Sequence, residues 1–221
     1  MCSRLQLKEE INLYRYDKGK KMIEEIFPTP IMVVDLSEML DMTDVHERCL
    51  KIISQPNHVC EHGLVPKGVS SYNSNTPVIT NDSIKDVKNI IMMQVRQLEK
   101  ALAIYPLEFT NSWINIMPKE STIGAHLHPY SVISGAFYLN AGEGAGEFVI
   151  ENPLYHSQMM MQSQGKSEYT KVFQSIEAKT GRLILFPSYL KHHVKGNNYE
   201  GRTVMSFNTN YDRRIDLKGS I

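Results

Sequence analysis

The sequence lacks several features that mark whole classes of protein. None of its apolar runs approaches the roughly 18 residues that a helix needs to cross a bilayer, and no apolar signal stretch opens the chain. Cysteine is scarce, because Cys2, Cys49 and Cys60 are the only three and they form no CxxC pair. We therefore expect a soluble protein of the reducing cytoplasm that has no membrane partner.

An excess of charge of either sign is also missing. Lys and Arg total 24 and Asp and Glu total 24, so the formal net charge is zero. Without a net positive field the chain has little to attract a polyanion, and we expect no nucleic acid among its partners. Hydrophobic residues at 42% and charged residues at 22% are ordinary for a globular protein, so we expect residues 1–221 to form a single domain. The sequence leaves the oligomeric state open, a homodimer included.

The N-terminal part of the chain predicts an arm and an edge strand. Residues 1–25 are polar and rich in charge, as is typical of an arm or a short amphipathic helix. Pro28 and Pro30 precede a β-branched run that ends at Asp35, which predicts an edge strand, where a missing N–H donor does little harm. We expect residues 26–106 as a whole to supply strand and helical support for a sheet.

Two helices are predicted within this supporting region. Thr43 is the expected cap of the first helix, which runs to about residue 54. Ser83, with Asp86 three residues later, has the form of a capping box and predicts the start of a second helix. Apolar residues repeat along the second helix at helical spacing over fewer than three heptads, so we expect it to pack on a sheet. Residues 55–80 between the two helices are predicted to be mostly loop.

From residue 107 onward, short apolar strands alternate with turn residues. This pattern predicts a mainly β (α+β) protein in which residues 107–221 form a double-stranded β-helix, or jelly-roll, supported by the N-terminal helices. The long connection at residues 152–166 is either a lid over a site or a surface loop. The expected strands lie near residues 112–117, 124–128, 132–139, 147–151, 169–176, 182–186, 193–195 and 203–211.

Histidines in this β half are the main functional clue. His126 and His128 are separated by one residue, so on an extended strand both project to the same face. Two imidazoles held in this way suit a divalent metal, although an HxH pair is also a frequent surface feature. A third ligand from the pair His192 and His193 would leave coordination positions open for substrate and oxidant. Neighbours on a strand face opposite sides, and we expect His193 to face away from the site.

Arg202 lies ten residues after His192, at the start of a run that predicts a core strand. A buried guanidinium is costly unless a partner compensates its charge. A carboxylate ligand held by two hydrogen bonds would be such a partner. The alternative is that Arg202 lies at a strand end, either exposed or paired with Glu200.

Several motifs follow one another along most of the chain from residue 27. They are Phe27-Pro-Thr-Pro-Ile31, Ser112-Trp-Ile-Asn115, the run from His126-Leu-His-Pro129 to Asn140, Gly181 to Pro187, Leu190-Lys-His192 and Arg202 to Asn208. In their order and spacing these motifs resemble the 2-oxoglutarate- and Fe(II)-dependent oxygenases. More narrowly, they resemble an uncharacterised prolyl-hydroxylase-like branch that has an HxHP motif.

The resemblance implies a role for individual residues. His126 and His192 match the first and the distal iron ligands of the superfamily. Arg202 matches the basic residue that holds the far carboxylate of 2-oxoglutarate, and Tyr138 matches an aromatic hydroxyl that binds the same carboxylate. Two further polar residues, Asn115 and Asn208, lie on strands that are expected to face inward. We expect them to line the co-substrate pocket, although each could instead close a turn.

His128 departs from the family pattern, which has an acid at this position. A neutral imidazole in place of a carboxylate leaves the metal site one unit more positive, which favours an anionic co-substrate and alters the redox properties. We expect His128 to be the third ligand. The sequence also allows an arrangement in which two histidines hold the iron and His128 only supports them.

The implied activity is hydroxylation of a small-molecule or peptide substrate that the sequence does not identify, with release of succinate and CO₂. Two alternatives stay open. One is a cupin-type metal dioxygenase or isomerase that works without 2-oxoglutarate, although the cupin pattern requires a Glu where Val132 or Ile133 stands. The other is a non-catalytic jelly-roll binding protein.

Overall fold

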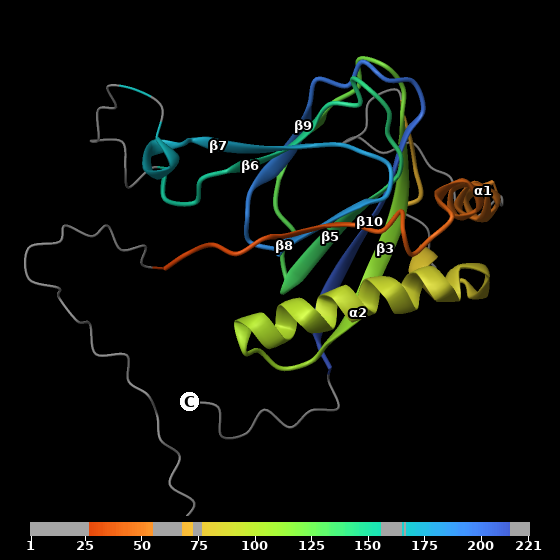
Figure 1. Cartoon of the computed structure of the whole chain (residues 1–221), viewed down its shortest axis with the longest axis horizontal. Helices are drawn as coiled ribbons and strands as arrows, with labels where there is room; N and C mark the ends of the chain where they lie inside the picture. The colour runs from red at the N-terminus through yellow and green to blue at the C-terminus, as the bar shows by residue number, and fades with distance from the viewer. Residues whose placement is uncertain (1–26, 55–67, 73–76, 156–164, 166, 213–221) are drawn as a thin grey trace, which may run out of the picture.

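Two β-sheets face one another and form the body of the molecule (Figure 1). The computed structural model describes residues 27–54, 68–72, 77–155, 165 and 167–212. The predicted arm at residues 1–25 and most of the long connection at residues 152–166 therefore lie outside the described residues. The mainly β jelly-roll fold that the strand pattern predicts is confirmed.

The larger sheet has six strands and the smaller sheet has four. The spatial order of the larger sheet is β1 (Met32–Asp35), β8 (Arg182–Pro187), β5 (Ile133–Asn140), β10 (Arg202–Tyr211), β3 (Leu107–Met117) and β2 (Val69–Ser70). The order of the smaller sheet is β4 (Ile123–His126), β9 (His192–Lys195), β6 (Glu147–Glu151) and β7 (Phe173–Glu177). All of the recorded strand pairs are antiparallel.

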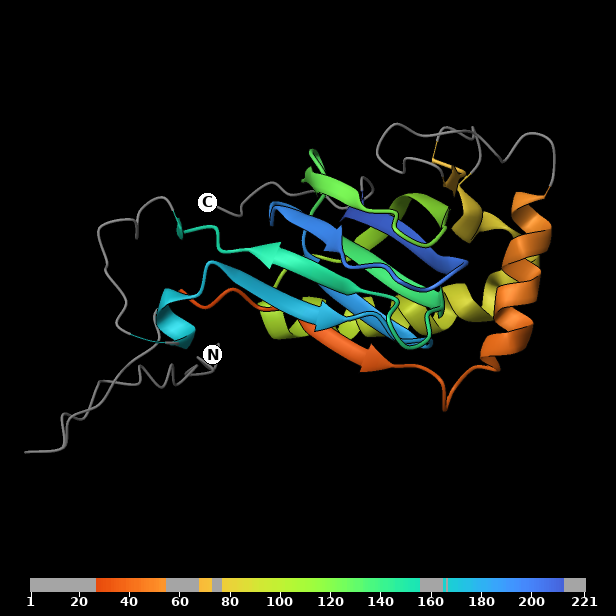
Figure 2. The same cartoon turned by 90° about the horizontal axis from the view of Figure 1, so that it is seen from above.

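Two helices cover the outer face of the larger sheet (Figure 1, Figure 2). They are α1 (Met42–Ile53) and α2 (Lys85–Leu102). Their buried residues, such as Val45 and Ile91, belong to one hydrophobic cluster with Phe137 of β5 and Phe207 of β10. The helices therefore cover one face of the larger sheet, and its other face is turned toward the smaller sheet.

Successive residues of β10 point alternately to the two faces of the larger sheet. Thr203, Met205 and Phe207 are buried on the helix-covered side, where Met205 and Phe207 join the hydrophobic cluster. Arg202 and Val204, together with the polar residues that continue the same alternation, face the space between the sheets. The sheet thus places a row of polar side chains against the smaller sheet.

The caps of both helices differ from the prediction. The cap of α1 is Asp41 and not Thr43, because the Asp41 carboxylate accepts hydrogen bonds from the N–H groups of Thr43 and Asp44. The capping box of Ser83 and Asp86 does not form. Two short 3₁₀ helices, η1 (Val78–Thr80) and η2 (Asp82–Ile84), precede α2, and Asp86 instead pairs with an arginine of α1 at 2.8 Å.

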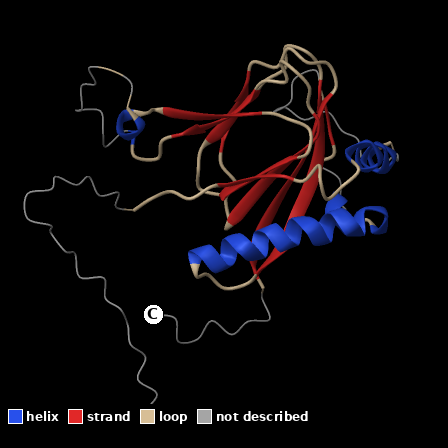
Figure 3. Ribbon diagram, viewed as in Figure 1, coloured by secondary structure: helices blue, strands red, loops and turns tan. Residues whose placement is uncertain are grey.

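Several strand limits also differ from the prediction. Strand β3 begins at Leu107, and β4 ends at His126, so His128 lies beyond the strand on which it was expected. Strand β7 begins at Phe173, because the preceding residues form the 3₁₀ helix η3 (Glu168–Thr170), and β9 begins at His192. The short strand β2 lies in the segment predicted to be mostly loop. The remaining described strands follow the predicted order along the chain, and Figure 3 shows the strands gathered in two layers with the helices outside them. No helix among the described residues is both long enough and apolar enough to span a bilayer.

Candidate metal centre and adjoining cavity

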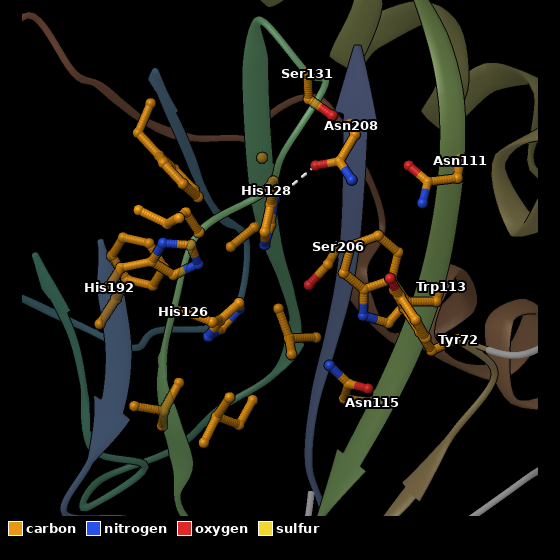
Figure 4. A pocket seen from close by; sticks show the side chains of 18 of the residues that line it. Tyr72, Asn111, Trp113, Asn115, His126, His128, Ser131, His192, Ser206 and Asn208 are labelled. Carbon is orange, nitrogen blue, oxygen red and sulfur yellow. Dashed lines mark hydrogen bonds between the residues drawn. The ribbon is translucent and has the colours of Figure 1, made fainter. Parts of the chain in front are cut away.

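A cavity of about 470 Å³ lies between the two sheets. One wall carries three histidines, and the facing wall carries polar and aromatic side chains of β3 and β10 (Figure 4). Arg202 and Tyr138 also line the cavity. Its volume falls within the range of roughly 300–1,000 Å³ that is usual for small-molecule sites.

His126, His128 and His192 come together although more than sixty residues separate the first from the last. One ligand nitrogen of each lies within 4.8 Å of the corresponding nitrogens of the other two. Strand pairing accounts for part of this arrangement, since His126 of β4 stands directly opposite His192 of β9. His128 is brought back toward them by a hydrogen bond of 3.1 Å from its backbone N–H to the carbonyl oxygen of Ser188.

Each of the three imidazoles is oriented by a hydrogen bond on its Nδ1 side. The Nδ1 of His126 lies 2.8 Å from the carbonyl oxygen of Gly124, and the Nδ1 of His192 lies 2.8 Å from that of Leu190. The Nδ1 of His128 lies 2.6 Å from Oδ1 of Asn208. A carbonyl oxygen can only accept, so each Nδ1 carries a proton, and in the neutral form of the ring Nε2 then keeps its lone pair.

Burial keeps two of these rings neutral. Burial, together with a smaller effect of the neighbouring His126, lowers the pKa of His128 to about 4 and that of His192 to about 3. Near neutral pH these two rings are therefore uncharged, as metal coordination requires. Three clustered imidazoles, each braced by an acceptor at its Nδ1, fit a divalent transition metal such as Fe(II).

Arg202 is fully buried and has no carboxylate partner among the residues that the structure describes. One terminal nitrogen donates to Oη of Tyr138 at 3.1 Å, and the other lies 2.8 Å from Sδ of Met117. Its Nε has no hydrogen-bond partner. The guanidinium also lies 5.0 Å from the centre of the Tyr138 ring. None of these contacts neutralises the charge, so the site is suited to an anionic ligand.

The two asparagines that were expected to contact a co-substrate have different surroundings. Asn115 of β3 lines the cavity, and its Oδ1 is buried without a hydrogen-bond partner. Asn208 of β10 also lines the cavity, but its Oδ1 is bonded to His128 and to the hydroxyl of Ser134. The amide oxygen of Asn208 is therefore already occupied by side chains of the protein.

Sequence reasoning did not identify the surroundings of the site in full. Ser134 and Met117, which contact Asn208 and Arg202, were not singled out. Alternation along a core strand would have marked Ser134 as a polar residue on an inward face. His193 lies outside the cavity lining, with its Nδ1 3.9 Å from the carboxylate of Glu151.

Comparisons with known proteins agree with this architecture. Residues 111–208 match the model of a family described as "Putative 2OG-Fe(II) oxygenase", and the matched segment contains the three histidines and Arg202. No curated protein sequence matches the chain.

Solved structures of several oxygenases resemble the fold. The chain is similar to a prolyl hydroxylase from Trichoplax adhaerens in complex with a hypoxia inducible factor peptide, with 13% identity, a TM-score of 0.57 and coverage of 83% of this chain and 84% of that one. A Pseudomonas putida prolyl-4-hydroxylase is 12% identical, with a TM-score of 0.55 and coverage of 83% and 94%. HygX from Streptomyces hygroscopicus, solved with nickel and 2-oxoglutarate, is 13% identical, with a TM-score of 0.52 and coverage of 84% of each chain.

Proposed function

We propose that the chain belongs to the 2-oxoglutarate- and Fe(II)-dependent oxygenase superfamily, whose model matches residues 111–208, and that it hydroxylates a substrate with release of succinate and CO₂. His126, His128 and His192 would hold the Fe(II) through their Nε2 atoms. Arg202 and Tyr138 would bind the distal carboxylate of 2-oxoglutarate. The enzyme would act on a small molecule or a peptide.

The observation that carries this proposal is the unneutralised charge of Arg202. A fully buried guanidinium without a carboxylate partner is expensive in the free protein. The dianion 2-oxoglutarate has one carboxylate to neutralise this charge and an oxo-acid end that can reach the metal. If the metal protein worked without such an anion, the free-energy cost of burying the Arg202 charge would have no explanation.

The residues of the chain would contribute binding, orientation and shielding from water. Fe(II) and 2-oxoglutarate, when bound, would supply the oxidation, with one oxygen atom of O₂ ending in succinate and the other in the hydroxylated product. Tyr138 is completely buried, and burial raises the pKa of its hydroxyl, so it stays protonated and can donate a hydrogen bond to a carboxylate. Phe148 and Phe186 pack against the ring of His192 and exclude water from that side of the site.

The wall opposite the histidines is where we propose that the substrate binds. The centres of the Trp113 indole and the His128 ring are 5.8 Å apart. The ring of Tyr72 packs edge-on against the Trp113 indole, with 4.9 Å between the ring centres. Ser206 and Asn111 line the same wall (Figure 4). Aromatic faces beside hydroxyl and amide groups suit either a ring-shaped small molecule or a peptide side chain. The similar structures contain ligands of both kinds, a peptide in one and hygromycin B in another.

An anaerobic titration with Fe(II) and then 2-oxoglutarate tests the proposal. We expect a weak visible charge-transfer band, followed after addition of O₂ by slow formation of succinate without added substrate. Arg202→Met should show neither the charge-transfer band nor succinate formation at ordinary co-substrate concentrations. We expect its apparent dissociation constant for 2-oxoglutarate to rise about a hundredfold or more, because a buried charge-assisted pair is lost.

Arg96→Met is the matched control, because Arg96 lies on α2 outside the cavity lining and its loss should leave the titration unchanged. A band and succinate formation that survive Arg202→Met would contradict the proposed co-substrate site. Metal binding without any response to 2-oxoglutarate would favour a cupin-type enzyme, and tight Zn(II) binding without oxidation would favour a binding protein.

A further inference from the structure

The three histidines differ in what orients them. His126 and His192 both donate from Nδ1 to the backbone carbonyl two residues earlier, and no substitution can remove such an acceptor. His128 donates instead to the side chain of Asn208, eighty residues away in the sequence. Of these three hydrogen bonds, the one from His128 is therefore the one whose acceptor is a side chain, so a substitution can remove it.

Asn208 belongs to a small buried network of hydrogen bonds. Its Oδ1 lies 2.6 Å from Nδ1 of His128 and 2.7 Å from Oγ of Ser134. The hydroxyl of Ser134 lies 2.8 Å from the same Nδ1 and 2.7 Å from Oγ of Ser188. Asn208 is 7% exposed, Ser134 is 0% exposed and Ser188 is 1% exposed. Water therefore has little access to replace any of these contacts.

The network allows one consistent placement of protons. The amide oxygen of Asn208 accepts from both His128 and Ser134, and Ser188 then donates to the oxygen of Ser134. This placement requires the His128 proton on Nδ1 and leaves its Nε2 free. A residue that offered a donor in place of the Asn208 oxygen would favour the opposite tautomer, whose Nε2 carries a proton and cannot bind a metal.

Strand register holds the acceptor in place. Asn208 of β10 stands directly opposite Ser134 of β5 in the larger sheet. On its other side Asn208 pairs with Asn111 of β3, and the register shifts at the next residue of β10. An acceptor carried by the central strands of a sheet is held more rigidly than one on a loop, as precise ligand orientation requires.

We propose that Asn208 is a positioning residue that fixes His128 as a neutral metal ligand in its Nδ1–H form. It does so without adding charge, because an amide accepts a hydrogen bond but carries no negative charge. The three-histidine ligand set therefore stays neutral. An aspartate at position 208 would accept the same hydrogen bond and also supply the negative charge that an acidic ligand brings at the position of His128. The metal-binding part of this inference rests on the proposed function.

Ring-nitrogen NMR of the metal-free protein tests the tautomer without any metal. In the native protein we expect the His128 proton on Nδ1, and in Asn208→Ala we expect a mixture of both tautomers. Asn208→Asp keeps the acceptor oxygen at nearly the same size and should keep the proton on Nδ1. Asn111→Ala is the control, because Asn111 faces the same cavity from the neighbouring strand and has no recorded contact with His128.

Competition with a chromogenic chelator for Co(II) measures the effect on the metal. We expect Asn208→Ala to weaken Co(II) binding about 10–100-fold, as is usual when the group that braces a metal-bound histidine is lost. Asn208→Asp should bind Co(II) more tightly than the native protein, which loss of packing alone cannot produce. Asn111→Ala should stay within about twofold of the native affinity.

Two results would overturn the proposal. One is an unchanged tautomer and Co(II) affinity in folded Asn208→Ala, and the other is weaker binding in Asn208→Asp than in the native protein. If Asn208→Ala does not fold, Asn208→Asp decides the question, with Ser134→Ala as a milder variant expected to show a smaller loss. If the Asn208 variants change the tautomer and the Co(II) affinity but the protein does not bind 2-oxoglutarate, the proposed function is refuted and this inference stands. If the protein binds 2-oxoglutarate but the Asn208 variants change neither quantity, only this inference is refuted.

Discussion

At the scale of single residues, Arg202 illustrates a conflict between stability and ligand binding. Its guanidinium is fully buried, and only a tyrosine hydroxyl and a thioether contact its terminal nitrogens. Replacing a buried charge that lacks a partner by an apolar side chain of similar length is often neutral or stabilising. We therefore expect Arg202→Met to unfold at the same temperature as the native protein, or at a higher one, when no co-substrate is present.

Thermal unfolding with and without 2-oxoglutarate checks this prediction. A ligand that binds only the folded state raises its stability, so the native protein loaded with Co(II) should gain several degrees on addition of 2-oxoglutarate. Arg202→Met should gain nothing. A variant that is several degrees less stable than the native protein without co-substrate would mean that Arg202 supports the fold through contacts with its neighbours.

The sequence identified residues whose chemistry is unusual for their position, and it predicted Asn208 as a residue of the pocket, but it missed Ser134 and the contact of Asn208 with His128. Two histidines at alternate positions and an arginine in an apolar strand are visible without a structure. Ser134 and Asn208 are ordinary polar residues, and their contact exists only because strand register brings β5 and β10 together. Register between distant strands follows from packing of the whole sheet, so one strand's sequence does not specify it.

At the scale of the elements, the centre of the larger sheet depends on a glycine. Gly135 of β5 stands directly opposite Phe207 of β10, and a β-carbon on Gly135 would overlap the Phe207 ring. Phe207 is itself fully buried and packs edge-on against Phe109 at 5.2 Å, so it has little room to move. We expect Gly135→Ala to lower the free energy of unfolding by about 1–3 kcal/mol through overpacking.

Urea denaturation measures this loss, and Gly124→Ala is its control. A β-carbon on Gly124 meets no atom within 4 Å, and the backbone there is not in the left-handed region, so the control should differ from the native protein by less than about 0.5 kcal/mol. Equal stability of the two variants would show that the Phe207 ring can move aside.

The order of the elements was predictable, and their ends were less so. Apolar periodicity located both helices, because a buried stripe such as that of α2 extends over many residues. Helix ends depend on single hydrogen bonds, and Asp41 competes with Thr43 for the same cap position. The carboxylate of Asp86 pairs with Arg48 of the other helix instead of completing a capping box with Ser83. Arg48 is distant from Asp86 in the sequence. Such tertiary contacts override local signals.

At the scale of the whole molecule, burial of histidines makes the metal-free fold sensitive to acid. Burial lowers the pKa of His128 to about 4 and of His192 to about 3, and it also lowers the pKa of His46, which lies beneath the larger sheet and contacts Thr203. In the unfolded chain each of these pKa values returns to about 6.5. Below that pH the unfolded chain binds more protons than the folded one, so stability falls as the pH falls.

We therefore expect the metal-free protein to lose stability between pH 7 and pH 5, by up to about 2 kcal/mol at pH 5 for each strongly shifted histidine. The carboxylates of Asp35 and Asp86 contribute little over this interval, since their pKa values lie below the ordinary value of 3.8, which is itself below pH 5. Urea midpoints at pH 7, 6 and 5 in the presence of a chelator measure the slope. His192→Gln should flatten it, because its unfolded state no longer gains a proton there. A native protein as stable at pH 5 as at pH 7 would mean that the folded rings accept protons readily, contrary to the burial that the structure gives them.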